Sequence, residues 1–308
     1  MIEDPPDAKF TSMLFLPPNP KRASEGGLRT KRYFKQSLPD KPLITVITVV
    51  FNCAKTLEDT IKSVVNQTYD NVEYIIIDGG STDGTVDIIR KYEEQIDYWV
   101  SEPDDGIYYA MNKGILLSKG SLIGILNAGD TYEPDSIRLL VKKYDQSHVS
   151  GIYYGDAVYL YTDLGVKTSV KASVPRLIHS MSISHQSIFI SEDIYRSYGL
   201  YDMKYRYAAD YAYLLKLFLD GRTFVYVGGG IACFATGGAS DVNIIRSRIE
   251  SLFAQFELNA PKKYLSVLLY IREVVYLYTY NILTLIFGKR LASSLRKKRI
   301  LKRSVPAV

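Results

Sequence analysis

Two runs of apolar, largely β-branched residues constrain the fold of this chain more than any other feature. The first extends from Leu43 to Val50, and the second from Tyr74 to Ile77. Runs of this length and content are typical of parallel strands that are covered on both faces. Residues Thr56 to Gln67 between them have the length and polarity of a crossover helix. The chain is therefore predicted to form a doubly wound α/β sheet with helices on both faces.

The alternation of strand and helix patterns continues to about residue 150. Further strands are predicted at Tyr98 to Ser101 and Leu122 to Leu126, and further helices at Thr85 to Glu94 and Ile107 to Ser118. Residues Ile152 to Val170 are rich in Tyr, Val and Thr around an Asp-Leu-Gly break, a pattern that predicts a hairpin. The second half is therefore expected to be mixed α+β.

Composition separates a main domain from a basic tail. The 308 residues are 47% hydrophobic, which supports a substantial core, and carry a formal net charge of +5. Eight cationic residues, with no acidic residue among them, follow residue 288: Lys289, Arg290, Arg296, Lys297, Lys298, Arg299, Lys302 and Arg303. Taking eight from +5 leaves −3 for the rest, so the main domain offers no basic face for nucleic acid, and a membrane surface is the expected partner of the tail.

The stretch before the basic block is aromatic and apolar. Its charge-free apolar piece from Val274 to Phe287 has 14 residues, fewer than the ~20 that span a bilayer. Residues 246–308 are therefore predicted to be a helical region that lies on the inner face of a membrane rather than crossing it. A helical hairpin packed on the core and a homodimer contact remain alternatives.

The remaining limits concern compartment and domain boundaries. Cys53 and Cys233 are the only cysteines, which indicates no disulfide framework and favours the cytoplasm. Residues 1–25 lack an apolar segment with a cleavage signal and so do not read as a signal peptide. Residues 1–41 are predicted to be an N-terminal extension, flexible or draped on the domain, and residues 42–245 the main domain.

Polar loops follow both opening strands, at the edge where open α/β sheets bind ligands. The first run ends at Phe51-Asn52, and the second ends at Asp78-Gly79-Gly80-Ser81-Thr82-Asp83-Gly84-Thr85. These residues resemble the family-two inverting glycosyltransferases of the GT-A fold, in which the second loop is typically Asp-Asp-Gly-Ser-x-Asp-Gly-Thr. The resemblance covers roughly residues 42–240, with Gly79 in place of the second Asp. It implies that Asn52, Asp78 and Gly80 bind the donor, Asp78 at the nucleobase, usually uracil, whereas Asp83 is expected to cap the following helix.

A third motif, Leu126-Asn127-Ala128-Gly129-Asp130, follows another apolar strand. Relatives carry Asp-x-Asp-Asp or Asn-x-Asp-Asp here, so the resemblance implies donor contacts at Asn127, Ala128 and Gly129, with Asn127 facing the ribose. It also implies that Asp130 holds Mn²⁺ or Mg²⁺, a hard cation that neutralises the diphosphate. Gly129 replaces an Asp of many relatives and leaves one carboxylate. The alternative is that Asp130 caps a helix from Glu133 to Lys143.

Ala110-Met111-Asn112-Lys113-Gly114 matches the usual Ala-Arg-Asn-x-Gly pattern of the family, with Met in place of Arg. The resemblance implies that Asn112 and Lys113 contact the donor, Lys113 as a point charge near phosphate; a solvated lysine is the alternative. The surrounding Glu-Pro-Asp-x-Gly-Ile-Tyr pattern is more familiar from transferases of bacterial surface-polysaccharide assembly than from cellulose or chitin synthases.

Inverting transfer needs a carboxylate that takes the acceptor's proton. The family places it at a helix start in the second half, and the matching residue is Asp210, with a capping role as the alternative and Asp202 as a second candidate. His185 and Gln186 resemble the His-Gln pair that many relatives carry near the acceptor; a structural histidine is equally open.

Together with these patterns, the resemblance implies a metal-dependent inverting hexosyltransferase that moves a sugar from a nucleotide-diphosphate sugar, UDP-linked, to a lipid-linked or saccharide acceptor. Cell-surface polysaccharide assembly at the inner face of a bacterial membrane is the expected setting. The alternatives are a sugar nucleotidyltransferase, which would release pyrophosphate, and a catalytically silent membrane scaffold with the same fold, which the departures at Gly79, Met111 and Gly129 would suit.

Overall fold

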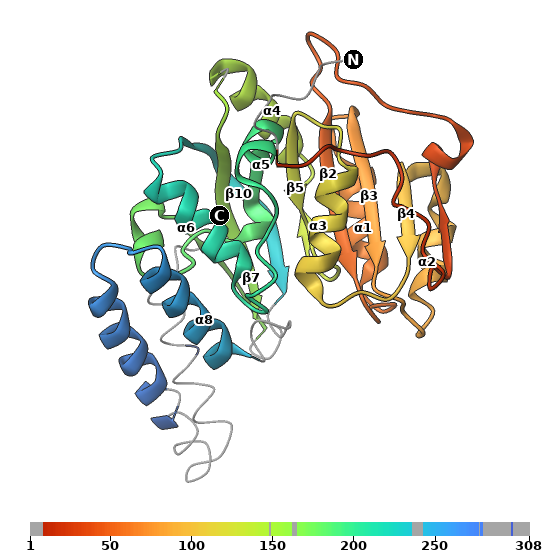
Figure 1. The fold of residues 1–308 in the computed structure, drawn as a ribbon. Helices are drawn as coiled ribbons and strands as arrows, with labels where there is room; N and C mark the ends of the chain where they lie inside the picture. Colours follow the sequence, from red (N-terminus) through yellow and green to blue (C-terminus); the bar gives the residue numbers. More distant parts are fainter. Residues whose placement is uncertain are drawn as a thin grey trace.

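The computed structural model describes residues 9–147, 149–161, 165–235, 243–276, 278, 279 and 297. The strands within these residues are β1 (Ser24–Gly26), β2 (Ile44–Val50), β3 (Val72–Asp78), β4 (Tyr98–Ser101), β5 (Leu122–Ile125), β6 (Thr131–Tyr132), β7 (Ile152–Tyr161), β8 (Val166–Val170), β9 (Ile188–Ser191) and β10 (Phe224–Ala235). They form one mixed sheet in the order β1-β4-β3-β2-β5-β9-β7-β10-β6, with β8 paired to β7 (Figure 1).

The helices are α1 (Leu57–Val65), α2 (Thr85–Lys91), α3 (Ile107–Leu117), α4 (Ser136–Ser147), α5 (Glu192–Tyr198), α6 (Ala209–Leu219) and α8 (Ile244–Glu257). Short 3₁₀ helices are η1 (Leu28–Lys31), η2 (Glu93–Gln95), η3 (Val174–Ile178) and η4 (His185–Ser187). Residues 263–276 after α8 are also helical.

The first half of the sheet is parallel, as the alternation of strands and helices predicted. Strand β2 pairs in parallel with β3 and with β5, and β3 pairs in parallel with β4. Successive residues of β2 point to opposite faces, so Ile47 and Val49 join a core with α3, α5 and α6, whereas Val46 and Val50 join a core with α1, α2 and α4. Burial on both faces explains why β2 is apolar along its whole length.

The second half of the sheet is mixed, as expected for this region. Strand β9 runs antiparallel to both β5 and β7, and β7 forms the predicted antiparallel hairpin with β8. Gly124 of β5 faces Phe189 of β9, and a Cβ at position 124 would lie 2.4 Å from the Phe189 ring. A glycine inside this strand is therefore required by the close approach of an aromatic ring.

Helix α4 begins at Ser136, three residues after the predicted start at Glu133. The preceding residues Thr131–Tyr132 form β6, which pairs antiparallel with Ala232 and Cys233 of β10. Pairing with β10 therefore makes the two residues directly before the predicted helix part of the sheet, and the helix begins later. Asp130 stands before β6, and the predicted capping alternative for this residue is wrong because α4 begins beyond that strand.

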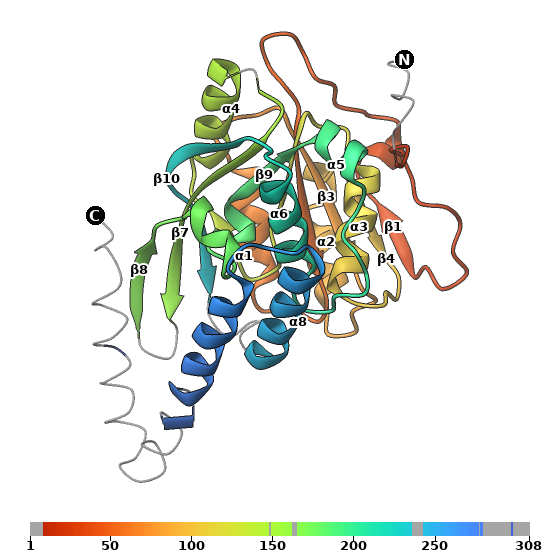
Figure 2. The same ribbon diagram turned by 60° about the vertical axis from the view of Figure 1, so that its left-hand side comes forward.

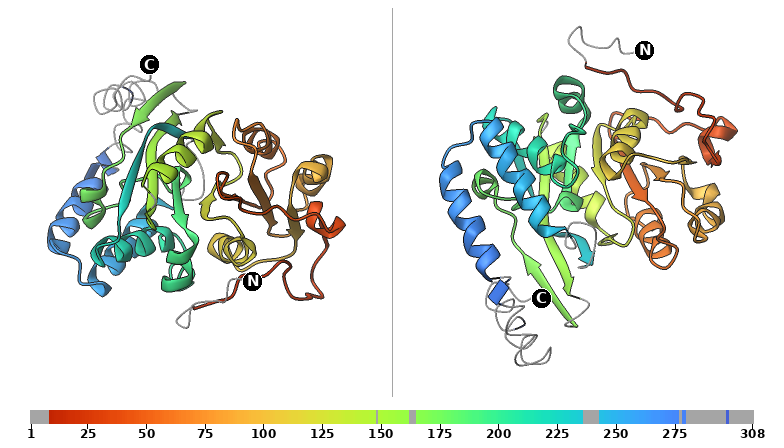
Figure 3. Two further views of the ribbon diagram at one scale, coloured as in Figure 1. Left: turned by 90° about the horizontal axis from the view of Figure 1, so that it is seen from above. Right: turned by 60° about the horizontal axis from the view of Figure 1, so that its bottom comes forward.

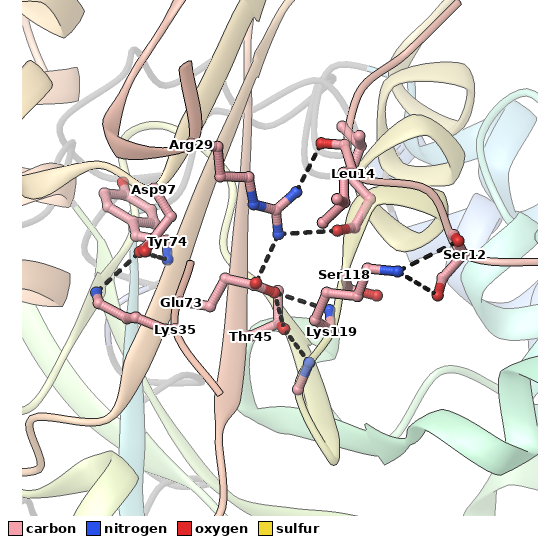
Figure 4. A network of polar contacts seen from close by, with 12 residues as sticks. Ser12, Leu14, Arg29, Lys35, Thr45, Glu73, Tyr74, Asp97, Ser118 and Lys119 are labelled. Carbon is pink, nitrogen blue, oxygen red and sulfur yellow. Dashed lines mark hydrogen bonds and ion pairs between the residues drawn. The ribbon is translucent and has the colours of Figure 1, made fainter. Parts of the chain in front are cut away.

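Residues 9–41 lie on the domain. Of the two alternatives predicted for the N-terminal extension, flexible or draped, the described part is draped. Strand β1 extends the sheet by pairing with β4, and Arg29 of η1 is only 2% exposed. Its guanidinium contacts Glu73 of β3 at 2.5 Å and donates to the carbonyl oxygens of Leu14 and Leu117 at 3.1 and 3.0 Å (Figure 4). The other Glu73 oxygen accepts hydrogen bonds from Thr45 and the Lys119 backbone, so both charges are fully engaged.

The C-terminal region begins on the domain, since Ala254 of α8 belongs to the core that α6 also joins. Within the described residues, no helix is both long and apolar enough to cross a bilayer. Seven of the eight predicted tail cations lie outside the described residues, Lys297 being the exception. Cys53 and Cys233 are both free thiols, as the sequence predicted.

We expect Arg29→Ala to lower the free energy of unfolding by about 3–5 kcal/mol, because it leaves the Glu73 carboxylate buried without its counter-charge. Lys31→Ala is the matched control, since Lys31 pairs with Glu94 at the exposed surface and should leave the unfolding midpoint nearly unchanged. Urea unfolding followed by circular dichroism measures both. Equal midpoints for the two variants would show that the buried pair does not anchor the N-terminal segment.

Candidate active site

Polar residues from four parts of the chain meet around Asp210 at the start of α6. Tyr108 of α3 donates its hydroxyl proton to Asp210 Oδ1 at 2.7 Å, and the Nδ1 of His185 lies 3.4 Å from Asp210 Oδ2. The other ring nitrogen of His185 lies 3.1 Å from the side-chain nitrogen of Asn127. The loop after β5, the entrance of β9, α3 and α6 are thus joined by one hydrogen-bonded chain. It connects three of the predicted site residues, Asn127, His185 and Asp210.

The neighbours of His185 define its tautomer. Its side chain is 19% exposed, and burial lowers the pKa of the imidazole, an effect that the nearby Asp210 charge opposes. The ring is therefore neutral at pH 7. The Asn127 amide nitrogen can only donate, so His185 Nε2 accepts and Nδ1 carries the proton toward Asp210. His185 and Tyr108 thus aim two donors at one carboxylate and fix its orientation.

Asp130 is buried in the same region, beside Gln186. The Gln186 amide donates to Asp130 Oδ2 at 2.7 Å, while the Thr60 hydroxyl donates to the Asp130 carbonyl oxygen at 2.8 Å. The Gly129 backbone nitrogen donates to the same Thr60 hydroxyl. Gln186 follows His185 in η4. The pair therefore contacts both carboxylates predicted to act in the site, His185 contacting Asp210 and Gln186 contacting Asp130.

The oxygen atoms of this loop fit a hard cation that takes its further ligands from outside the protein. In the described part of the chain, no three His, Cys, Asp or Glu side chains are grouped so as to hold a metal by themselves. The side-chain oxygen of Asn127, three residues before Asp130, is buried and has no hydrogen-bond partner among the described residues. A carboxylate and an unsatisfied amide oxygen are both hard oxygen donors, which Mg²⁺ and Mn²⁺ prefer.

Asp78 organises the loop after β3. The carboxylate is 0% exposed, and its Oδ2 accepts hydrogen bonds from the backbone nitrogens of Gly80 and Ser81 and from the Ser101 hydroxyl, at 3.1, 2.9 and 2.6 Å. Oδ1 accepts the Ser81 hydroxyl. A carboxylate oxygen has two lone pairs, so Oδ1 retains capacity for one further donor. Asp83 in the same loop accepts from the backbone nitrogen of Thr85, the first residue of α2, but the N-cap position itself belongs to Gly84, one residue after the expected Asp83.

Asp104 is a site residue that the sequence patterns did not single out. Its Oδ2 would lie 2.7 Å from a Cβ at position 79, so the Asp104 carboxylate fills the space that a second Asp of the loop would enter. Burial raises the pKa of Asp104, with a smaller contribution from the charge of Asp78. The departure from the family pattern at Gly79 therefore has a steric explanation, and the region still contains two acidic side chains.

The other predicted donor residues are tied to neighbouring segments. Both polar atoms of the Asn112 side chain bind the backbone of Tyr201, each at 2.9 Å. Lys113 is buried rather than solvated, with its ammonium 2.5 Å from Glu102 and 4.6 Å from the centre of the Tyr109 ring. Asn52 accepts from the Thr82 backbone and thereby joins the loops after β2 and β3. The Ala128 nitrogen donates to the Val49 carbonyl oxygen at 3.2 Å.

Two further contacts could not be read from the sequence. Glu250 of α8 accepts from the backbone nitrogens of Tyr207 and Ala208 at 2.6 and 3.0 Å, and so holds the segment that leads into Asp210. Tyr108 sits within a recognisable motif, but nothing in that motif pairs it with residue 210. Asp202, the second candidate base, is exposed and pairs with Lys204 at 2.9 Å, apart from this hydrogen-bonded chain.

Comparison with known proteins assigns the class. Residues 45–181 match the family model Glycosyl transferase family 2. The chain is 32% identical over 179 residues to an uncharacterized glycosyltransferase of Mycobacterium tuberculosis, covering 57% of this chain and 68% of that protein. The chain therefore belongs to glycosyl transferase family 2.

Two relatives have more specific names. A PGL/p-HBAD biosynthesis glycosyltransferase of Mycobacterium tuberculosis is 29% identical over 181 residues, which is 58% of this chain and 70% of the relative. The putative teichuronic acid biosynthesis glycosyltransferase TuaG of Bacillus subtilis is 37% identical over 100 residues, 32% of this chain and 40% of TuaG. Both names describe the relatives.

Solved structures agree on the GT-A-like fold. TarS 1–349 of S. aureus in complex with UDP-GlcNAc matches with a TM-score of 0.57 at 14% identity, over 73% of this chain and 68% of that one. The mannosyltransferase PcManGT of Pyrobaculum calidifontis, in complex with GDP-Man and Mn²⁺, matches with a TM-score of 0.55 at 16% identity, over 87% and 92% of the two chains. These identities establish the fold alone.

We expect sugar-transfer activity to fall as the pH decreases below the ordinary histidine pKa of about 6.5. Burial lowers the pKa of His185, so the ring stays neutral down to a pH below that value. Protonation then places an N–H on Nε2, which faces the N–H of the Asn127 amide, and the hydrogen bond between the two side chains is lost. In His185→Gln the amide can donate to Asp210 and accept from Asn127 without titrating, so the acid limb of the pH–rate profile should move to lower pH. Superimposable profiles for the two proteins would rule out this role of His185.

Proposed function

We propose that this protein is an inverting glycosyltransferase that uses a nucleotide-diphosphate sugar, UDP-linked, with Asp210 as the general base. The observation that carries the proposal is the chain of contacts from Asn127 through His185 to Asp210. It joins the end of β5, where the donor is expected to bind, to the start of α6, where the general base is expected. The nucleotide complexes of the structural neighbours support the donor class, one with UDP-GlcNAc and one with GDP-Man.

The proposed chemistry is a single displacement. The acceptor hydroxyl oxygen attacks the anomeric carbon as the bond from that carbon to the diphosphate oxygen breaks, and nucleoside diphosphate leaves. The hydroxyl proton passes to the Asp210 carboxylate, which Tyr108 and His185 hold in one orientation. Attack opposite the leaving group inverts the anomeric centre. No covalent sugar–enzyme intermediate is required.

A divalent cation, Mn²⁺ or Mg²⁺, belongs to the proposal as a stabiliser of the leaving diphosphate. Asp130 would hold it, with the unsatisfied side-chain oxygen of Asn127 as a second protein oxygen or as a contact to the ribose. The Mn²⁺ complex of one structural neighbour supports this part of the proposal. Asn52, Asp78 and Gly80 are proposed to bind the base side of the donor, and His185 and Gln186 the acceptor side.

A lipid-linked or saccharide acceptor, in cell-surface polysaccharide assembly at the cytoplasmic face of a membrane, completes the proposal. The names of the mycobacterial relative and of TuaG support this setting. So do the aromatic helix after α8 and the cationic residues that end the sequence, which suit an anionic membrane surface.

We expect Asp210→Asn to bind UDP with wild-type affinity and to lose about 10²- to 10⁴-fold in turnover, because only proton removal is affected. Asp78→Ala should instead weaken UDP binding, since the loop loses the acceptor that orders it. Isothermal titration measures binding, and release of nucleoside diphosphate from a panel of UDP-sugars measures turnover. Equal loss of UDP binding in both variants would contradict the assignment of Asp210. Release of pyrophosphate would favour a nucleotidyltransferase, and binding without any product a silent scaffold.

We expect Asp130→Asn to abolish transfer and to remove the additional thermal stabilisation that Mn²⁺ gives in the presence of UDP. Asp135→Asn is the matched control, because Asp135 lies nearby in the sequence but pairs with Arg138 at the surface. Thermal unfolding with UDP, with and without Mn²⁺, provides the readout. Full activity of Asp130→Asn, or wild-type activity in excess chelator, would exclude metal dependence.

A further inference from the structure

A cavity of about 530 Å³ lies away from Asp210, between η3, α8 and the helical residues 263–276. These two C-terminal helices lie at the outside of the molecule, next to each other in every view (Figures 2 and 3). None of the residues that line the cavity belongs to the candidate active site. The cavity is therefore a separate space that the proposed transfer reaction does not yet use.

Positive charge dominates the cavity wall. Three arginines line it, Arg176, Arg248 and Arg272, against one carboxylate, Glu273, which pairs with Arg248 at 3.1 Å. Among the residues that the structure describes, Arg176 and Arg272 have no ion-pair partner. Such an excess of guanidinium groups suits a phosphate, which arginine binds in bidentate fashion.

A buried polar atom at the wall also lacks a partner. Gln255 of α8 is 1% exposed, and its side-chain nitrogen donates to the Tyr211 hydroxyl at 2.9 Å and to the His179 carbonyl oxygen at 3.2 Å. Its Oε1 has no hydrogen-bond partner in the described part of the chain. The carbonyl of His179 can only accept, so the amide orientation is fixed and the unsatisfied atom is an acceptor. A buried acceptor without a donor is costly, and a ligand hydroxyl would satisfy it.

Both helices that border the cavity also expose apolar side chains to solvent. On α8 the exposed residues recur at helical spacing, as do those that follow it, with Phe253 65% and Leu268 64% exposed. The set comprises Ile245, Ile249, Phe253 and Phe256 on α8, then Tyr264, Leu268, Ile271, Val275 and Tyr278. A cationic cavity between two helices that also expose apolar side chains fits an amphiphile rather than a free anion.

We propose that this cavity binds the phosphorylated head group of the lipid-linked acceptor, with Arg176 and Arg272 on phosphate and Gln255 on a sugar hydroxyl. This proposal rests on the proposed function, because it supplies the acceptor side of the same reaction. The hydrocarbon lies along the exposed apolar residues of α8 and 263–278.

The cavity is connected to the catalytic carboxylate through two residues. Tyr211, next to Asp210, donates its hydroxyl proton to the Leu177 carbonyl oxygen and receives the Gln255 amide. Glu250, which lies between the cavity-lining residues Arg248 and Ser251 of α8, holds the backbone of Tyr207 and Ala208. A head group in the cavity therefore contacts the same helix that positions the segment leading into Asp210.

The test measures binding of farnesyl diphosphate, which combines a diphosphate with a prenyl chain, by isothermal titration. We expect Arg176→Gln/Arg272→Gln to weaken it at least about tenfold, since two charge-assisted contacts are lost. The control Arg90→Gln/Arg138→Gln removes equal charge from surface ion pairs on α2 and α4 and should bind as the wild type does. Equal affinity of the two double variants would overturn the proposal.

Two further probes separate the sources of affinity. Inorganic pyrophosphate and farnesol should each bind more weakly than farnesyl diphosphate; pyrophosphate binding as tightly would make this a free-anion site and overturn the lipid assignment. UDP binding, measured on the same proteins, should be unchanged in both double variants. If the Arg176→Gln/Arg272→Gln variant loses only farnesyl diphosphate binding, the loss is assigned to the cavity. If the wild type fails to bind UDP, the proposed function itself is contradicted.

Discussion

The antiparallel pairing of β9 with β5 is the constraint on which the candidate site depends. Strand β5 runs parallel to β2, so its polar loop with Asn127 and Asp130 opens at the carboxyl edge of the sheet. Because β9 runs the other way, its entrance lies at that same edge, and His185 and Gln186 meet the β5 loop there. Gly124 permits this register by leaving room for the Phe189 ring. Reversing β9 would carry the His-Gln pair to the opposite edge.

Burial then turns this proximity into fixed geometry. Polar groups removed from water require partners, and the partners at this edge come from segments far apart in sequence. A neutral His185 is suited to the position between Asn127 and Asp210 because one ring nitrogen accepts while the other donates. Tyr108, whose pKa burial raises well above its ordinary value, remains a donor to Asp210. The carboxylate is oriented without a net positive charge beside it.

A spatial neighbour also accounts for the departure from the family pattern at Gly79. Gly79 lacks the side chain of the usual second Asp, and Asp104 from the following loop fills that space. Lys113 follows Asn112 in the altered helix motif, and its charge is balanced by the buried Glu102 rather than by solvent. The sequence motif alone shows that a carboxylate is missing at position 79. The folded chain still brings two carboxylates, Asp78 and Asp104, to the carboxyl edge of the sheet.

The sequence by itself determined the parallel strands and their crossover helices, since double-sided burial requires uninterrupted apolar runs and their polar loops must open at one edge. It also determined which residues stand at those strand ends, Asp78 and Asp130 among them. Only the tertiary structure decided their partners: Gln186 for Asp130, Tyr108 and His185 for Asp210, and Glu250 for the segment before it. It likewise converted Thr131–Tyr132 into β6 and set Arg29 against Glu73. The physical reason is range, because local patterns record burial and backbone preference, whereas hydrogen bonds and ion pairs between distant segments form only once the register of the sheet is fixed.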